Sequence, residues 1–420
     1  MTSIADAAWL KHRGLQVLLA ALTEGGEQAR IAGGAVRNTL LGEPVTDIDI
    51  ATTTLPDDTM RRAEDAGFKV VPTGYEHGTI TVIAMGRAYE VTTLRADVET
   101  FGRHARVVFG RDWKADAERR DFTINALYAE ADGSVVDLVG GLADLRARTL
   151  RFIGDPETRI REDYLRILRF FRFFAWYGSG RPDAEGLKAC ARLKEGLAHL
   201  SVERVWMELK KLLGAPDPAR TLLWMRQTGV LTAVLPESEK WGIDAIHALV
   251  EAERVFGWPV EPLLRLAAIL PPDPARVSGL AERLRFSKAE TAMLVAWAEA
   301  PLPDASLKEA DFLKSLYRAE QKGIEWRLRL ALAAARARAP DSDKALIEAA
   351  GFRRLLDIAL RWKKPAFPVR GKDLVELGFA PGEEIGRMLG QLEDRWIASG
   401  FTLSREQLLR NVEGRPQAPS

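Results

Sequence analysis

The sequence is poor in the residues that build disulfides and zinc sites. It holds 1 cysteine, Cys190, and 5 histidines in a chain of 420 residues. A lone cysteine excludes an intramolecular disulfide and a cysteine-based zinc site, and the histidines lack the spacing of a zinc-binding pair. A metal-dependent phosphohydrolase would need a cluster of histidines and aspartates that activates water, and the sequence has no such cluster.

Long apolar runs and an excess of charge are also missing. No stretch approaches the length of a membrane-spanning helix, and the first residues lack the basic-then-apolar order of a signal peptide. We therefore expect a cytoplasmic protein without a membrane partner. The 60 Lys and Arg residues balance the 59 Asp and Glu residues. Binding of nucleic acid would thus depend on local basic surfaces rather than on the charge of the whole chain.

The hydrophobic pattern divides the chain into a mixed part and a helical part. A hydrophobic content of 47% provides a sizeable core, and the length of 420 residues predicts more than one domain. Up to about residue 154 short runs predict strands, and from residue 156 onward nearly every segment has a helical period. We expect strands at 68–71, 79–84, 88–94 and 135–138, a partly mobile loop or hairpin at 95–111, and helices that include 7–22, 56–66, 119–128, 156–177, 184–198, 201–213 and 276–300.

Residues 30–53, ARIAGGAVRNTLLGEPVTDIDIAT, predict a strand, a glycine turn, a short helix and a second strand that carries two aspartates. Side chains alternate across a strand, so Asp47 and Asp49 should project from one face. Two carboxylates in this arrangement suit Mg²⁺, which often takes one or two carboxylates and completes its shell with substrate phosphates and water.

The glycine turn of this stretch has the features of a phosphate site. Gly33 and Gly34 have no Cβ and let the backbone approach an anion closely, while a helix that begins near Ala35 would direct its N–H groups at that anion. Arg37 adds a positive charge. A glycine pair alone is usually a turn, and an Asp-x-Asp pair alone is usually a solvated strand end. Together, the phosphate cradle and the carboxylates indicate nucleotidyl transfer.

The pattern GGAVRN-x8-DIDIAT resembles the signature of the class II tRNA nucleotidyltransferases and bacterial poly(A) polymerases, in the polymerase β superfamily. The resemblance implies that Asp47 and Asp49 are catalytic and bind Mg²⁺, with Glu90 on a neighbouring strand as a third metal ligand. Glu90 is also explained as a surface glutamate on an edge strand.

The same resemblance implies an α+β fold, in which a polymerase β-type nucleotidyltransferase head with a small mixed sheet is followed by an all-helical neck, body and tail. The boundaries that we expect are 1–154 for the head, 155–215 for the neck, 216–345 for the body and 346–420 for the tail.

A second motif, RRDFTINALY at residues 119–128, matches the family nearly letter for letter. On its own, an Arg-Arg-Asp run is most often a solvated surface with an internal ion pair. The resemblance implies instead that Arg120 or Arg119 contacts the phosphate or sugar of a nucleotide. It also implies that Asp121 and Asn125 keep the pocket in shape.

A third motif lies in residues 161–173, REDYLRILRFFRF, which we expect to form a helix. Asp163, Arg166, Arg169 and Arg172 recur every three residues and would follow one face that turns slowly round the helix. The pattern alone favours an exposed amphipathic helix with ion pairs between neighbouring turns.

A carboxylate beside a guanidinium can also recognise a base. Cytosine and adenine both present an amine next to a ring-nitrogen acceptor, so that Asp163 can accept from the amine while Arg166 donates to the nitrogen. Uracil and guanine reverse both polarities and would leave buried groups unpaired. The motif resembles the family's E-D-x-x-R template, with Glu162, Asp163 and Arg166 in place. The resemblance implies that Arg169 and Arg172 hold the triphosphate, and that CTP and ATP are selected without a nucleic-acid template.

Other segments resemble family elements without a catalytic role. Residues 135–154 resemble the element that joins head to neck, and Glu203 with Arg204 would brace the neck. Residues 353–372 hold seven Lys and Arg residues and one acidic residue. They form either a solvated helix end or a surface on which an RNA backbone rests. Residues 371–389 resemble the tail of tRNA nucleotidyltransferases, which favours tRNA as the partner.

The resemblance as a whole implies addition of C, C and A to the 3′ end of tRNA. Asn38 departs from it, because the family commonly has aspartate there. Residues 94–111 have the length, but only loosely the sequence, of the flexible loop with which CCA-adding members switch from C to A. No H-D phosphohydrolase motif follows the neck, so we expect no additional phosphatase activity.

Several alternatives stay open at the level of the sequence. A poly(A) polymerase, or an enzyme that adds only A or only CC, would share every head motif. A catalytically silent RNA-binding protein is disfavoured, because it would have no need for the carboxylates of Asp47 and Asp49. The sequence does not indicate an oligomeric state.

Overall fold

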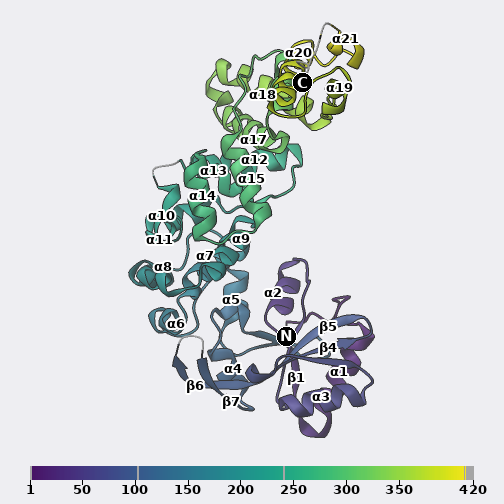
Figure 1. Ribbon diagram of the computed structural model, residues 1–420. Helices are drawn as coiled ribbons and strands as arrows, with labels where there is room; N and C mark the ends of the chain where they lie inside the picture. The colour runs from purple at the N-terminus through teal and green to yellow at the C-terminus, as the bar shows by residue number, and fades with distance from the viewer. Residues whose placement is uncertain (1, 102–103, 240–241, 411, 413–420) are drawn as a thin grey trace. The chain divides into compact units, whose positions relative to one another are not determined.

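The computed structural model describes residues 2–101, 104–239, 242–410 and 412 of the chain. Contacts divide the chain into two compact units, Met1–Glu239 and Lys240–Ser420, which are described separately below (Figure 1). The finer division into head, neck, body and tail stays a prediction.

A seven-stranded mixed sheet lies at the centre of the N-terminal part of the first unit, with the strand order β3-β4-β5-β2-β1-β8-β9. Strands β2 and β5 are parallel, and the other neighbouring strands are antiparallel. In β4 the alternation of the sequence explains the strand, because Ile80, Val82 and Ala84 are buried and the residues between them are half-buried. The strands are β1 Ala29–Ala32, β2 Asp49–Thr52, β3 Lys69–Gly74, β4 Thr79–Ala84, β5 Arg87–Thr93, β8 Leu127–Ala129 and β9 Val135–Asp137.

Strands β6 (Arg95–Phe101) and β7 (His104–Phe109) form a separate two-stranded antiparallel sheet. Within the described residues of 95–111 the pairing is that of the expected hairpin, and residues 102 and 103 lie outside the described residues. Helix α4 (Trp113–Glu118) follows directly, and the side chain of Asp112 caps it by accepting hydrogen bonds from two backbone N–H groups of its first turn.

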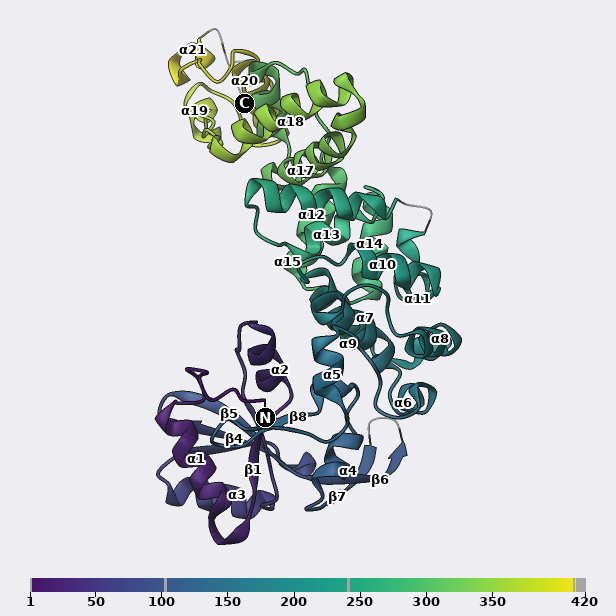
Figure 2. The same cartoon turned by 180° about the vertical axis from the view of Figure 1, so that it is seen from behind.

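Helices α1 and α3 contact each other and strand β4, and Figure 2 shows them side by side next to the sheet. The helix expected at 7–22 begins only at Arg13. In α8, Cys190 is fully buried, and burial raises the pKa of its thiol well above the usual value. Besides α4, the helices of the first unit are α1 Arg13–Thr23, α2 Gly34–Leu41, α3 Pro56–Asp65, α5 Gly141–Arg146, α6 Pro156–Glu162, α7 Leu165–Tyr177, α8 Ala184–Leu193, α9 Val202–Leu213, α10 Ala219–Gln227 and α11 Val230–Val234.

The helix expected across residues 119–128 is wrong. Residues Thr123–Asn125 form a single 3-10 turn, and strand β8 begins at Leu127. The side chain of Asp121 accepts hydrogen bonds from the backbone N–H of Phe122 and from the side chain of Asn125, at 2.9 Å each. Local side-chain bonds of this kind compete with helical backbone bonds, and they stop a helix here despite its favourable pattern.

A cluster of phenylalanines packs helix α7 against Phe122, which precedes β8, and Phe152, which follows α5. The ring centroids of Phe122 and Phe152 are 4.9 Å apart, and that of Phe170 in α7 is 5.4 Å from Phe152. Phe173, one turn further along α7, contacts Phe122 at 5.4 Å. Because these rings are buried, they fix α7 against the residues that precede β8.

Within its described residues, the regular elements of the second unit are all helices. Residues 276–300, expected as one helix, are divided between α14 and α15. A capping box between Ser287 and Glu290 starts the second of them. The helices are α12 Asp244–Phe256, α13 Pro262–Ala268, α14 Pro274–Arg283, α15 Lys288–Glu299, α16 Glu309–Arg318, α17 Gln321–Arg338, α18 Asp343–Arg361, α19 Gly371–Glu376, α20 Glu383–Ala398 and α21 Arg405–Leu409. Within the described parts of both units, no helix has the length and apolar character that crossing a membrane requires.

Candidate active site

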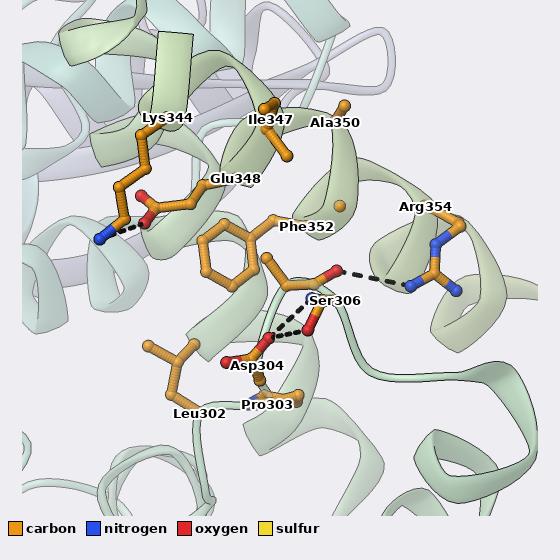
Figure 3. A pocket seen from close by; sticks show the side chains of 12 residues that line it. Leu302, Pro303, Asp304, Ser306, Lys344, Ile347, Glu348, Ala350, Phe352 and Arg354 are labelled. Atoms are coloured by element: carbon orange, nitrogen blue, oxygen red, sulfur yellow. Dashed lines mark hydrogen bonds and ion pairs between the residues drawn. The ribbon is translucent and has the colours of Figure 1, made fainter. Parts of the chain in front are cut away.

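The second unit contains a cavity of about 1020 Å³ between residues 302–306 and helix α18 (Figure 3). Its wall is mostly apolar and includes the ring of Phe352. Its charged residues include Lys344 and Glu348, which pair with each other at 3.9 Å. None of the motifs that carry nucleotide chemistry reaches it, so we place the active site elsewhere.

A polar cavity of about 480 Å³ in the first unit contains the motif residues. Its walls come from the glycine turn after β1, the start of β2, the segment between α4 and β8, and helices α7 and α9. The residues that line it are Gly33, Gly34, Arg37, Asp49, Arg119, Arg120, Asp121, Asn125, Asp163, Leu165, Arg166, Arg169, Phe173 and Arg204. They include every residue that we expected to hold the nucleotide except Arg172.

The glycine turn needs its first glycine for two reasons. Gly33 has φ +63° and ψ −108°, a conformation that a residue with a Cβ rarely adopts. A Cβ at this position would also lie 3.1 Å from the carbonyl oxygen of Asn125 and 3.4 Å from Nη1 of Arg120. Helix α2 begins at Gly34, next to the start that we expected near Ala35, so that its N-terminus lies at the pocket.

A second cleft, of about 340 Å³, adjoins this pocket and shares Gly34, Arg37 and Asp49 with it. Asp47 lies just before β2 and Asp49 is the first residue of that strand. Both border the second cleft, which agrees with the expectation that their carboxylates project from the same face.

Glu90 in β5 is in register with Asp49 in the parallel strand β2. The pKa of Asp49 is raised, first because its carboxyl loses hydration at the pocket wall and then because the charge of Glu90 is close. The guanidinium of Arg120 offsets part of this effect, and Asp47 adds to it. A cation between the carboxylates would relieve their mutual repulsion.

The carboxylates of Asp47, Asp49 and Glu90 take part in none of the ion pairs found between described residues. Nor do the described His, Cys, Asp and Glu side chains gather anywhere in a group of three or more that could hold a metal ion. The donor set is therefore a carboxylate pair rather than a complete cage. Such a pair fits Mg²⁺, which prefers oxygen ligands and takes others from substrate phosphates and water. The role of Glu90 as a third ligand stays a prediction.

Most arginines of the pocket form an ion pair with a carboxylate of the protein. Arg119 and Arg120 both bind the buried side chain of Asp116 in α4, with shortest distances of 2.5 and 3.1 Å. The hydroxyl of Tyr128 donates to the same carboxylate at 2.7 Å. The run of two arginines and Asp121 therefore has no internal ion pair, because its arginines bind a residue upstream.

Asp121 itself binds Arg169 of α7, with its Oδ2 at 2.5 Å from Nη2 and 2.7 Å from Nε. Burial alone would raise the pKa of Asp121, but Arg169 and the hydrogen bond from Asn125 hold it below the usual value. The side-chain oxygen of Asn125, Oδ1, accepts a hydrogen bond from Arg37. Asp121 and Asn125 thus connect the glycine turn to α7, in keeping with the shaping role that we expected.

The segment 156–177 is interrupted at Asp163, whose extended backbone (φ −154°, ψ 109°) separates α6 from α7. Its Oδ1 accepts from the backbone N–H of Leu165 at 3.0 Å, and its Oδ2 accepts from Nη2 of Arg204 at 2.6 Å. The continuous helix that we expected here is therefore wrong, because the aspartate that faces the pocket has an extended backbone and its side chain accepts from the first N–H of the next helix. Arg204 lines the pocket rather than only bracing a helix.

Arg166 is fixed by Glu162, the residue before Asp163 in the motif. Its Nη1 donates to the carboxylate of Glu162 and to the carbonyl oxygen of Arg159, the latter at 2.9 Å. The side chain of Arg166 is only 15% exposed. Asp163 and Arg166 both line the pocket, so the structure brings together the two residues that we expected to choose the base.

Arg172 lies at the second cleft, together with Trp176, Tyr177 and Lys211. Its Nε donates to Glu208 of α9 at 2.5 Å. Residues three apart on a helix differ by about 60° in direction, so two such steps turn Arg172 well away from Arg166. The three-residue repeat in the sequence predicted Arg166 and Arg172 on one face that turns slowly round the helix. The rotation between them is large enough to place them in neighbouring clefts.

Two residues that support the site were missed at the level of sequence: Asp116, which binds two arginines of the pocket, and Tyr177, which lines the second cleft. Asp116 precedes Arg119 and Arg120 by three and four residues, which is the spacing of ion pairs on a helix, and this signal could have identified it. Tyr177 gave no comparable signal. Its hydroxyl accepts from Arg37 at 2.9 Å and its ring lies 4.1 Å from that guanidinium, across 140 residues of sequence.

Comparison with known proteins places this site in a family. Residues 29–151 match the model of the poly A polymerase head domain, and residues 181–241 match that of a probable RNA and SrmB-binding site of polymerase A. CCA tRNA nucleotidyltransferase 1, mitochondrial, from Danio rerio is 35% identical over 403 residues, which cover 92% of this chain and 87% of that protein. The chain belongs to the CCA tRNA nucleotidyltransferase family.

Other members of the CCA tRNA nucleotidyltransferase family agree with this placement. The CCA-adding enzyme of Geobacillus stearothermophilus is 40% identical over 241 residues, 57% of each chain. The crystal structure of the Bacillus stearothermophilus CCA-adding enzyme in complex with CTP matches with a TM-score of 0.69 and 27% identity, covering 92% of this chain and 93% of that one. The predicted fold, a polymerase β-type head with a mixed sheet followed by helices, is therefore confirmed.

Proposed function

We propose that this protein adds C, C and A to the 3′ end of tRNA, with CTP and ATP as substrates. The observation that carries the proposal is an arginine-lined pocket and an aromatic cleft that meet at Asp49. Relatives named for this activity align with more than nine-tenths of the chain, which supports it.

We assign the arginine-lined pocket to the incoming nucleotide. Arg119, Arg120 and Arg169 line it and would offset the charge of a triphosphate through charge-assisted hydrogen bonds. Gly33 and Gly34 leave space for phosphate oxygens at the start of helix α2.

Asp163 and Arg166 would choose the base. Each oxygen of the Asp163 carboxylate accepts one hydrogen bond within the protein, so a lone pair remains on each for the exocyclic amine of cytosine or adenine. Arg166 would donate to the adjacent ring nitrogen. Glu162 holds the Arg166 guanidinium in a fixed orientation, which lowers the entropic cost of recognition.

We assign the second cleft to the 3′ end of tRNA. Trp176 and Tyr177 provide ring faces on which a terminal base can stack, and Arg172 and Lys211 provide positive charge for its phosphate. The terminal hydroxyl would then lie beside Asp49, attack the α-phosphate of the nucleotide and release pyrophosphate.

Asp47 and Asp49 would hold Mg²⁺ at the junction of the two clefts. When bound, the ion supplies a lowered pKa for the attacking hydroxyl and compensation of the charge on the leaving pyrophosphate. The fit rests on a carboxylate pair without an arginine partner among the described residues, in a site otherwise rich in arginine.

The remaining assignments follow the sequence. Residues 353–372 would bind the tRNA backbone as part of a tail, 346–420, behind a head at 1–154, a neck at 155–215 and a body at 216–345. We propose a cytoplasmic location, although some relatives are mitochondrial proteins by name.

The test is a reaction of purified protein, Mg²⁺ and a tRNA transcript that ends at the discriminator base. CTP alone, ATP alone and both together are supplied, and the 3′ ends are sequenced. We expect CC with CTP alone and CCA with both, and no further addition. A run of A with ATP alone would indicate a poly(A) polymerase, and addition of A only to a CC end would indicate an A-adding enzyme. No addition to any end, with tRNA still bound, would favour a non-catalytic RNA-binding protein.

A further inference from the structure

We propose that Asp116 is a positioning residue, a single buried carboxylate that orients both Arg119 and Arg120 toward the phosphates of the incoming nucleotide. Asp116 lies outside the RRDFTINALY motif, on helix α4. The proposal rests on the assignment of the arginine-lined pocket to the nucleotide. It identifies the group that orients two arginines of that pocket.

The carboxylate of Asp116 is saturated with hydrogen-bond donors from Arg119, Arg120 and Tyr128. Its side chain is 1% exposed. Oδ1 accepts from Nε and Nη2 of Arg119 at 2.8 and 2.5 Å. Oδ2 accepts from Nη2 and Nε of Arg120 at 3.1 and 3.3 Å and from the hydroxyl of Tyr128 at 2.7 Å.

Both arginines use the same edge of the guanidinium to bind Asp116. The Nε–Nη2 edge is occupied in each case, which leaves the Nη1 end to face away from the carboxylate. In Arg120 that end donates to the carbonyl of Asn125 at 3.3 Å and lies 3.4 Å from where a Cβ on Gly33 would be. Asp116 therefore aims the Nη1 end of Arg120 at the glycine turn, where we expect the phosphates.

The charges also point to a role in binding. One carboxylate neutralises one of the two guanidiniums, so the group as a whole keeps a positive charge. The side chains of Arg119 and Arg120 are 17% and 22% exposed and line the pocket. A flexible arginine loses rotamer freedom when it binds a phosphate, and an arginine already held by Asp116 has lost that freedom beforehand.

The experiment compares Asp116→Asn with Asp144→Asn. Asp144 is a matched control, since it is also a buried carboxylate of the first unit that pairs with an arginine, but its partner, Arg151, does not line the pocket. We expect Asp116→Asn to raise the KM for CTP and for ATP about tenfold while kcat changes less, because binding rather than chemistry is disturbed. Asp144→Asn should lower the melting temperature to a similar degree and leave both KM values unchanged.

A lysine series keeps the proposal testable even if Asp116→Asn does not fold. Arg119→Lys and Arg120→Lys retain the charge but remove the edge that Asp116 holds, so each should raise the KM for both nucleotides. Wild-type KM values in the lysine variants would overturn the positioning role, because a charge alone would then suffice.

Alanine variants distinguish the positioning role of Asp116 from the assignment of the pocket to the nucleotide. If Arg119→Ala and Arg120→Ala raise the KM but a folded Asp116→Asn does not, the pocket assignment stands and the positioning role of Asp116 is overturned. If both alanine variants keep wild-type KM values, the assignment of the pocket to the nucleotide fails, and the role of Asp116 fails with it.

Discussion

Asp47 and Asp49 differ from the carboxylates around them in what they bind. Asp116, Asp121 and Asp163 each hold an arginine, whereas the aspartate pair takes part in none of the ion pairs between described residues. A carboxylate that stabilises the fold is paired with a cationic side chain, whereas a carboxylate that binds a ligand has no such partner in the protein. At the scale of single residues, the absence of an ion-pair partner for Asp47 and Asp49 among the described residues therefore marks them as the carboxylates of the site.

Replacing either Asp47 or Asp49 with alanine should lower the rate of nucleotide addition by at least about a hundredfold, because the site loses half of its metal carboxylates. Affinity for tRNA, measured by filter binding, should stay near that of the wild type. Asp6→Ala, which removes an exposed carboxylate from the same unit, serves as the control. Activity near the wild-type level in either variant would contradict the metal assignment.

Asp121 should make the stability of the first unit depend on pH. Its pKa is below the usual value in the folded state, so its contribution is complete above the unfolded pKa of about 4 and is lost as the pH falls through the lower folded pKa. The free energy of unfolding should therefore fall with pH in the acid range, and less steeply in Asp121→Asn.

Urea unfolding of both proteins at a series of pH values measures this difference. The Asn variant cannot bind Arg169 as an ion pair, and we expect it to be less stable than the wild type near pH 7. Equal slopes in the two proteins would mean that Asp121 does not carry a lowered pKa.

Single residues were easier to predict than the contacts between them. The motif letters identified nearly every residue of the pocket, but not the pairs that hold it together. Asp121 and Arg169 are 48 positions apart, and Asp163 and Arg204 are 41 apart. Contacts over such separations depend on how helices pack, and one sequence carries no local signal for them.

At the scale of elements, strands were predicted well except for β8, which the expected helix at 119–128 overlapped, and helix ends were not. β4 follows from an alternation that only a strand can bury on one side. The breaks at Asp121 and Asp163 were missed, because each depends on a side chain that bonds to nearby backbone and ends or caps a helix. Both breaks are at the pocket, where an aspartate serves the fold and the site at once.

Close packing between helices in the second unit gives a prediction at the same scale. A Cβ on Gly323, near the start of α17, would lie 2.3 Å from the carbonyl oxygen of Ala296 in α15. Gly323→Ala should therefore force the two helices apart and cost about 1–3 kcal/mol of stability. Gly279 in α14 has no atom within 4 Å of such a Cβ, so Gly279→Ala should be neutral or stabilise by up to about 1 kcal/mol.

Thermal unfolding of the two variants provides the comparison, since both glycines are in helices of the same compact unit. A melting temperature for Gly323→Ala at or above that of Gly279→Ala would show that α15 and α17 can separate without cost. The absolute change matters less than the order of the two variants.

At the scale of the whole molecule, the sequence predicted the change from a mixed to a helical architecture but not the compact units. Contacts divide the chain near residue 239, and the finer boundaries expected from the family resemblance stay predictions. A unit boundary depends on how helices pack across it, and the sequence pattern does not record that packing.

The basic segment 353–372 should make tRNA binding sensitive to salt. Lys363 and Lys372 are both exposed within it. Changing both to glutamine should weaken binding and reduce the slope of log K against log salt by about 1 for each phosphate that the variant no longer neutralises. Lys11→Gln, in the first unit, is the control. An unchanged slope in the double variant would mean that this segment does not bind the phosphate backbone.

The buried thiol of Cys190 has a practical consequence for spectroscopy. A thiol that is both enclosed and hard to ionise does not react with maleimide reagents, because these attack the exposed thiolate. A surface cysteine introduced into each compact unit would then accept a fluorophore without removal of the native residue. Such a doubly labelled chain would report by energy transfer whether the distance between the two dyes changes when tRNA binds.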